Sequence, residues 1–110
     1  MDDLLLAQKV ETMIQYAYVA LRQFPKSERH VLSQELRLTL WRILRLVIVS
    51  AKRRDPRQSL AALDADIELL RRQIRLAREL EMLPFRQYEV WSRHLNEVGR
   101  IVGAWLKRAR

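Results

Sequence analysis

The sequence predicts an all-α protein, an antiparallel up-down-up-down four-helix bundle that assembles as a homo-oligomer. Apolar residues recur at spacings of three and four along nearly all of the 110 residues, which is the period of an amphipathic helix. Prolines at positions 25, 56 and 84 divide this pattern into four segments of similar length, and no segment alternates as a strand would. Short connections between long helices make successive helices antiparallel neighbours, so the pattern favours a bundle.

The length of the chain suits one domain, with helices expected at about residues 2–24, 27–53, 56–82 and 85–108. Each helix would be about 35–40 Å long at a rise of about 1.5 Å per residue. The sustained spacing of three and four predicts helices that cross at about 20°.

The first two expected helices each present one apolar stripe. The first stripe consists of Leu6, Val10, Met13, Ala17, Ala20 and Phe24. Pro25 ends this helix, Ser27 is suited to cap the next one, and Glu28 suits the positive end of its dipole. The second stripe consists of Leu36, Leu40, Ile43, Leu44, Val47 and Ala51.

The third expected helix follows Asp55, which can cap it, and Pro56, which fits a first helical position. Its stripe consists of Leu60, Leu63, Ile67, Leu70, Ile74 and Ala77. Pro84 marks the next break. The stripe of the fourth helix consists of Tyr88, Trp91, Leu95, Val98, Val102 and Trp105.

The second and third helices carry further apolar residues that one bundle core does not use. A wider core-facing stripe would account for them, but monomers seldom expose large contiguous apolar patches. We therefore predict a subunit interface, formed by Leu38, Trp41, Ile48, Leu69, Leu76 and Leu80. Leu83 belongs to the same apolar line on the third helix.

The chain is strongly basic, with a formal net charge of +8 and 17 arginines among its 21 cations. The second and fourth helices carry the excess positive charge. Arginine binds phosphates and carboxylates through a planar fork, often with two hydrogen bonds. This charge indicates a nucleic acid, an acidic protein surface or an anionic lipid as partner, without choosing among them.

A basic row on the fourth helix, Arg86, Arg93, Arg100 and Lys107, recurs every seven residues. It lies almost opposite the apolar stripe and contains no acid, whereas an ordinary solvated face mixes signs to gain i,i+4 ion pairs. We therefore favour a row that binds phosphates or acids over a solvated face.

Two other groups of cations are less decisive. Arg71, Arg75 and Arg78 share one side of the third helix with three acids, Asp64, Glu68 and Glu79, so structural ion pairing is an equal alternative there. Arg53 and Arg54 belong to a basic run at the loop before Pro56, where they could meet phosphates or only solvate the turn.

The sequence offers no catalytic or metal-binding constellation. It has no cysteine, and His30 and His94 lie on different helices without acids at ligand spacing, so a zinc site is not expected. It also lacks a glycine-rich loop for a nucleotide and a nucleophile motif. We expect a non-enzymatic protein without cofactor or metal. The acidic N-terminus and the absence of a long apolar run predict a cytoplasmic protein with no membrane partner.

Gly99 and Gly103, the two glycines of the chain, both fall inside the fourth helix. Glycine costs a helix interior about 1 kcal/mol relative to alanine. At about 100° per residue both positions lie between the apolar stripe and the basic row. We predict that they allow close approach of a neighbouring helix, within the bundle or across a subunit boundary, with room for a phosphate as the lesser alternative.

Several stretches resemble a known family. QFPKSERHVLSQELRLTLWRI, residues 23–43, resembles the opening of the four-helix-bundle proteins encoded in 23S ribosomal RNA intervening sequences. LRRQIRLA (residues 70–77) and NEVGRIVGAWLKR (residues 96–108) resemble the accessory variability determinant (Avd) of diversity-generating retroelements, a sister branch. The similarity covers about four-fifths of the chain, and SAKRRDP after the second helix favours the retroelement branch.

The resemblance implies a homopentameric barrel of four-helix subunits. It implies binding to the retroelement reverse transcriptase and to template RNA and/or DNA, in support of mutagenic reverse transcription by the partner. The basic positions that match the family are Arg71, Arg75 and Arg100. Two other functions stay open. One is a structural protein–protein interaction module of the intervening-sequence type, and the other, which is the weaker alternative, is binding to a membrane surface.

Overall fold

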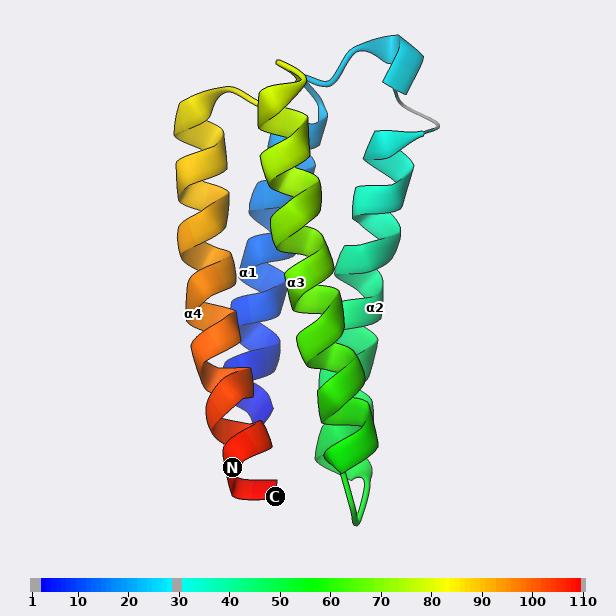
Figure 1. The fold of residues 1–110 in the computed structure, drawn as a ribbon, viewed down its shortest axis with the longest axis vertical. Helices are drawn as coiled ribbons and strands as arrows, with labels where there is room; N and C mark the ends of the chain where they lie inside the picture. The colour runs from blue at the N-terminus through cyan, green and yellow to red at the C-terminus, as the bar shows by residue number, and fades with distance from the viewer. Residues whose placement is uncertain (1–2, 29–30, 110) are drawn as a thin grey trace.

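The fold, in a computed structural model that describes residues 3–28 and 31–109, is an all-α four-helix bundle, as predicted. Its helices are α1 (Asp3–Leu21), α2 (Leu32–Lys52), α3 (Arg57–Glu79) and α4 (Phe85–Ala109), with a short 3₁₀ helix, η1 (Lys26–Glu28), after α1. Each α-helix packs against its sequence neighbours, and α4 packs against α1 to close the bundle. The α2–α3 loop lies at the same end as both termini (Figure 1).

The core consists of the predicted stripes. All six stripe residues of α3 and all six of the first helix segment are buried, although Phe24 lies just beyond the end of α1. Trp91 and Trp105 are the largest buried side chains. Three stripe assignments need correction: Leu44 and Tyr88 are only half-buried, and Ala51 is exposed. Truncating a buried leucine such as Leu40 to alanine would cost about 2–5 kcal/mol.

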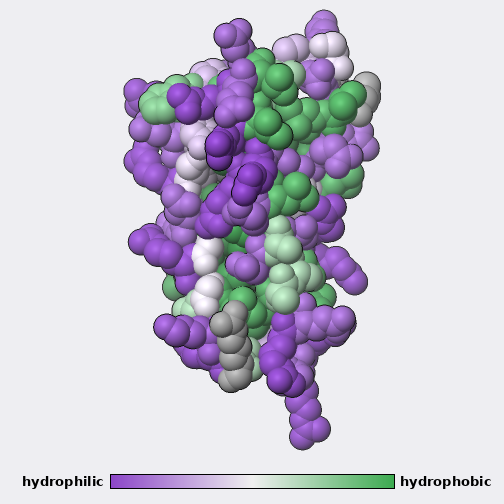
Figure 2. Space-filling model, in the orientation of Figure 1, coloured by the Kyte–Doolittle hydropathy of each residue, from purple (hydrophilic) through white to green (hydrophobic). Residues whose placement is uncertain are grey.

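The six apolar side chains predicted to form an interface all lie outside this core. Each exposes between 41 and 58% of its surface: Leu38, Trp41, Ile48, Leu69, Leu76 and Leu80. A wider core therefore does not account for these six. Leu83, which belongs to the same apolar line as Leu69, Leu76 and Leu80, is buried. Figure 2 shows hydrophobic residues gathered over α2 and α3 in the upper half of the view. The role of the six in assembly stays a prediction.

The exposed apolar residues of α2 lie on two different sides of that helix. Trp41 donates its indole N–H to the hydroxyl of Tyr18 on α1, at 3.0 Å. Its neighbour Arg42 binds both carboxylate oxygens of Asp66 on α3, at 3.1 and 3.2 Å. At about 100° per residue, Ile48 shares the α1 side with Trp41, and Leu38 lies nearer the α3 side. The subunit thus presents two apolar faces, which we name the α1–α2 face and the α2–α3 face.

The second helix begins later than expected. α2 starts at Leu32 rather than near residue 27, and Ser27 lies in η1 instead of capping it. The N–H of Glu28 bonds to the carbonyl of Pro25 at 2.9 Å, so the chain after the proline closes a single tight turn. Such a turn carries the chain from the end of α1 to the start of α2. The expected start of the first helix at residue 2, and His30, fall outside the described residues.

The third helix ends at Glu79, three residues before the expected end, in a Schellman motif. The N–H of Met82 bonds to the carbonyl of Ala77 at 2.9 Å, and the N–H of Glu81 to that of Arg78 at 2.9 Å. Glu81 occupies the left-handed position of this motif, with φ of 64°. Glycine is the usual residue there, so the sequence held no signal for this helix end.

Candidate nucleic-acid interface

The basic row of α4 carries positive charge that no ion pair within the described residues neutralises. Arg86, Arg93, Arg100 and Lys107 are all exposed. Among the residues that the structure describes, none of the four forms an ion pair, although six ion pairs occur elsewhere. Cations that are not neutralised within the protein remain available to phosphates.

The cations of α3 are partly neutralised, as the ion-pairing alternative predicted. Arg71 and Arg72 both contact Glu68, at 3.5 and 3.2 Å, and Arg75 contacts Glu79 at 3.5 Å. The hydrogen bond from Arg72 lowers the pKa of the Glu68 carboxyl, so this acid is ionised at neutral pH. One carboxylate shared by two guanidinium groups leaves a net positive charge on this side of α3.

Arg78 takes a different partner. Its guanidinium lies over the rings of two α4 residues, 4.6 Å from the centre of Phe85 and 5.3 Å from that of Tyr88. These cation–π contacts join the C-terminal end of α3 to the start of α4. Asp64, the third acid expected to pair on α3, forms no ion pair within the described part of the chain.

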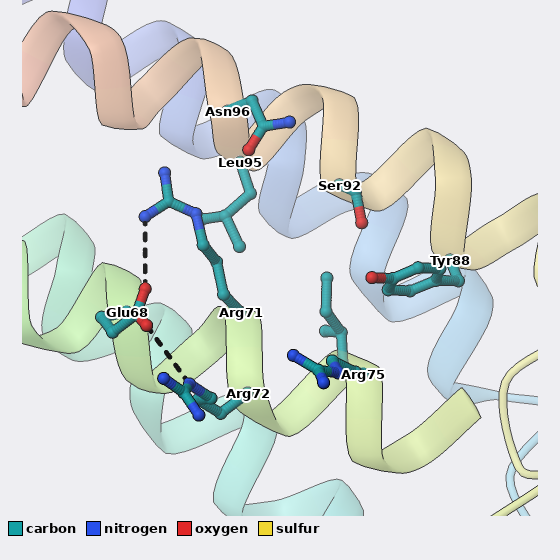
Figure 3. Close-up of a pocket in the computed structure, with 9 residues that line it drawn as sticks. Glu68, Arg71, Arg72, Arg75, Tyr88, Ser92, Leu95 and Asn96 are labelled. Atoms are coloured by element: carbon teal, nitrogen blue, oxygen red, sulfur yellow. Dashed lines mark hydrogen bonds and ion pairs between the residues drawn. The ribbon is translucent and has the colours of Figure 1, made fainter. Parts of the chain in front are cut away.

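A groove between α3 and α4 brings the two sets of cations together. Its upper part, nearer the α3–α4 connection, is lined by Arg71, Arg72 and Arg75 of α3 and by Tyr88, Ser92 and Asn96 of α4, with Glu68 at one edge (Figure 3). Its lower part is lined by Arg71, Arg93, Asn96, Glu97, Gly99 and Arg100. Arg71 and Asn96 line both parts, and we call the two parts together the α3–α4 groove.

The chemistry of the α3–α4 groove suits a polyanion. Guanidinium groups bind phosphate oxygens, and the hydroxyl and amide groups of α4 can add hydrogen bonds to phosphate, sugar or base. The acid of the lower part, Glu97, is held by Lys9 of α1, and that hydrogen bond lowers the pKa of the Glu97 carboxyl. Because this charge is already compensated, it opposes an incoming phosphate little.

A comparison with protein families agrees with the resemblance. The model of the bAvd-like family matches residues 4–109. The chain belongs to the bAvd-like family. A search of curated proteins finds no match. Membership of this family fits an accessory protein and suggests a non-catalytic one.

Within this bAvd-like protein, four of the eight predicted nucleic-acid-binding residues meet at the α3–α4 groove: Arg71, Arg75, Arg93 and Arg100. Arg86 and Lys107 lie beyond the lining of the groove, towards the two ends of α4. Tyr88, Ser92 and Asn96 were not predicted from the sequence as groove residues. Their spacing of four along α4, beside the basic row, was the signal that could have identified them.

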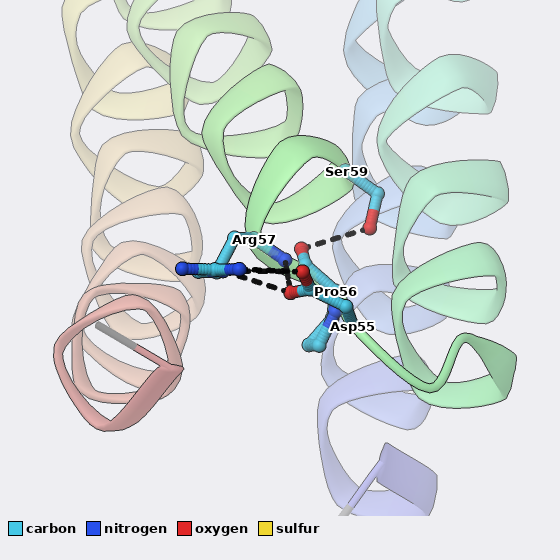
Figure 4. Close-up of polar contacts among 4 residues, drawn as sticks. All are labelled: Asp55, Pro56, Arg57 and Ser59. Atoms are coloured by element: carbon cyan, nitrogen blue, oxygen red, sulfur yellow. Dashed lines mark hydrogen bonds and ion pairs between the residues drawn. The ribbon is translucent and has the colours of Figure 1, made fainter.

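Arg53 and Arg54 lie elsewhere, in the loop between α2 and α3. Asp55 shapes this loop, since its carboxylate accepts the backbone N–H of Arg57 at 3.2 Å and binds the Arg57 guanidinium (Figure 4). The hydrogen bonds from Arg57 lower the pKa of Asp55 to about 2. Asp55 thus binds the first residue of α3, but it does not cap the helix as predicted. Pro56 is the N-cap instead of the first helical residue, and no described side chain caps this end of α3.

The two glycines of the bAvd-like chain differ in their surroundings. A Cβ at Gly99 would collide with the guanidinium Nη2 of Arg71 and lie 3.6 Å from its Cζ. Gly99 therefore accommodates a side chain from α3. Among the described residues, a Cβ at Gly103 would meet no atom of a neighbouring helix within 4 Å, so the close approach predicted at Gly103 is not found within that part of the bundle. Its subunit-boundary alternative stays a prediction.

No helix within the described ranges, residues 3–28 and 31–109, is sufficiently long and apolar to span a membrane. The same residues contain no cluster of three or more histidine or acidic side chains placed to hold a metal ion.

Proposed function

We propose that this bAvd-like protein is a non-catalytic accessory protein of a diversity-generating retroelement. It binds nucleic acid, the template RNA or the cDNA copied from it, together with the reverse transcriptase, in the cytoplasm. The polymerase chemistry belongs to that partner. The observation that carries the proposal is the uncompensated basic row of α4 beside the arginines of the α3–α4 groove.

The groove and the row favour a nucleic acid because their contacts suit a repeating anion. Arg93, Arg100 and Lys107 follow one another every seven residues, at about 10 Å intervals along a helix with a rise of 1.5 Å per residue. A flexible single strand or a duplex backbone can place phosphates at such intervals. Binding through phosphates is mainly electrostatic, so it should depend steeply on salt and weakly on sequence.

The two apolar faces support self-association, with the pentamer that the family resemblance implies as the proposed assembly. A contact between two different faces is heterologous, and it closes into a ring when the rotation between subunits divides a full turn. The α1–α2 face of one subunit against the α2–α3 face of the next would give such a contact. It would bury Trp41 and Leu76, which each expose 51% of their surface.

The test is purification of the protein with and without a candidate reverse transcriptase and its structured template RNA, with mass measured by light scattering. We expect an oligomer that shifts to a larger mass with either partner. Trp91 and Trp105 are buried, so a change in Trp emission with concentration would report on the half-exposed Trp41. A monomer that ignores both partners would overturn the proposal.

A second candidate is a structural module that docks an acidic protein surface, favoured by the six exposed apolar side chains. Nuclease treatment separates the two functions, because a complex held by RNA dissociates and a direct protein complex persists. Gene neighbourhood also separates them. A reverse transcriptase gene with paired template and variable repeats beside it would support the retroelement role.

A further inference from the structure

The contact between Gly99 and Arg71 has a consequence for the α3–α4 groove. The side chain of Arg71 leaves α3 and reaches across towards Asn96 and Leu95 of α4 (Figure 3). Its guanidinium occupies the space that a Cβ at Gly99 would fill. Arg71 keeps 40% of its side chain exposed, so it lies on the wall of the groove and is still open to a ligand.

This placement adds an arginine of α3 to two arginines of α4. Arg71, Arg93 and Arg100 all line the lower part of the groove, with the Asn96 amide beside them. Neither Arg93 nor Arg100 forms an ion pair within the described residues, and Arg71 contacts only the shared Glu68, at 3.5 Å. Three arginines from two helices therefore line one shallow depression whose acid, Glu97, is bound by Lys9.

We infer that Gly99 is a positioning residue that completes a phosphate clamp formed by Arg71, Arg93 and Arg100. The ligand of the clamp is a phosphate group. Its assignment to the phosphodiester backbone of RNA or DNA rests on the proposed function, and free phosphate has the same chemistry. A Cβ at position 99 would leave no room for Nη2 of Arg71 where it lies, so the end of this flexible side chain would have to shift. Arginine suits this task because its fork gives two parallel hydrogen bonds to phosphate oxygens.

The rest of α4 supports this assignment. Glycine is unfavourable in a helix interior, yet Gly99 lies in the middle of a helix of 25 residues and has no positive φ to require it. Within the described residues, the absence of a side chain at Gly99 makes room for Arg71. The other neighbour, Cγ2 of Ile67, would lie at an ordinary 3.8 Å from a Cβ at this position. The sequence thus accepts a weaker helix at the point where the arginine crosses it.

The two glycines provide a matched pair of variants. Gly99→Ala and Gly103→Ala make the same chemical change one turn apart on α4, but only the first displaces an arginine. Alanine is the better helix former at both positions, so within the subunit both variants should keep the fold, and Gly99→Ala does so once the end of the Arg71 side chain has shifted. Only Gly99→Ala should weaken binding to a single-stranded RNA, by at most about fivefold at 0.1 M salt. That limit is the loss of one whole phosphate contact, which contributes a slope of about 0.7 for single strands.

A double variant tests whether Gly99 acts through Arg71. Arg71→Ala alone should weaken binding as much as Gly99→Ala does, and adding Gly99→Ala to it should change nothing further. Equal binding by Gly99→Ala and Gly103→Ala would overturn the inference. So would a full additional loss in the double variant, because the glycine would then act by another route.

Inorganic phosphate distinguishes a failed clamp from a failed function. Two glycines give two glycine amide resonances in an NMR spectrum, so Gly99 reports on the clamp and Gly103 serves as the internal reference. Phosphate should shift the Gly99 resonance in the wild type and not in Arg71→Ala. If the wild type binds phosphate in this way but no RNA, the proposed function fails and the clamp stands. If phosphate leaves both resonances unchanged, the clamp is wrong whether or not RNA binds.

Discussion

Replacing Arg93, Arg100 and Lys107 together by alanine tests whether the basic row of α4 carries nucleic-acid binding. All three side chains are exposed, and none forms an ion pair in the described part of the chain. Their removal therefore breaks no internal contact of that kind and leaves the buried stripe of α4 intact. The fold should be retained, with a thermal midpoint close to that of the wild type.

The expected effect follows from the number of phosphate contacts removed. Each neutralised phosphate contributes about 0.9 to the slope of log K against log salt on B-form duplexes, and about 0.7 on single strands. If each of the three cations meets one phosphate, the triple variant should flatten the slope by about 2–3 units. Binding at low salt should fall steeply, while binding at high salt should converge on the wild type.

The assay is an equilibrium titration of a fluorescent RNA at several salt concentrations. A triple variant of Arg22, Lys26 and Arg45 provides the control, because it removes the same charge from exposed positions that line no part of the α3–α4 groove. Its slope should change much less. An unchanged slope in the α4 variant, or an equal loss in both variants, would refute the assignment of the row.

Three further outcomes are expected. Glu81→Gly should raise the free energy of unfolding by about 1 kcal/mol in a denaturant titration, because position 81 has a left-handed backbone and the left-handed conformation costs other residues about 1–2 kcal/mol. A variant with Leu76→Glu and Leu80→Glu should fold but show a lower mass by light scattering, and an unchanged mass would exclude the α2–α3 face from assembly. Arg57→Gln should lower the thermal midpoint above about pH 4, because the Arg57 hydrogen bonds hold the pKa of Asp55 at about 2. A lowered carboxyl pKa stabilises the fold above the ordinary value of 3.8, and this stabilisation is lost as the pH falls through about 2. A pH-independent difference would contradict it.

The fold could be predicted because the hydrophobic period carries most of the information in a bundle. The stripe of α3 is buried throughout, and the six apolar residues predicted to form an interface are exposed. Helix ends were harder, since local signals are ambiguous there. Ser27 after a proline is compatible with a helix cap and with a tight turn, and the structure has the turn. Glu81 takes a conformation for which glycine is the usual signal, so the end of α3 was misplaced.

The site was only partly predictable because it depends on two helices. The period of seven identifies Arg93 and Arg100 on one side of α4, and it says nothing of which α3 residue faces them. That partner is set by the length of the α3–α4 connection and by the rotation of each helix about its axis. The family resemblance pointed to Arg71, and the structure supplies the contact, a guanidinium lying where Gly99 has no side chain.

The unequal surroundings of the two glycines bear on assembly as well as on binding. Gly99 is explained within the subunit by Arg71, so its cost to the helix has a local compensation. Gly103 has the same cost to the helix, and within residues 3–28 and 31–109 the space that its Cβ would fill is open. It is exposed one turn further along α4, next to the end of the bundle that carries both termini. A second subunit packed closely against this turn would supply the missing compensation, which makes Gly103 the position where the boundary between subunits should be sought first.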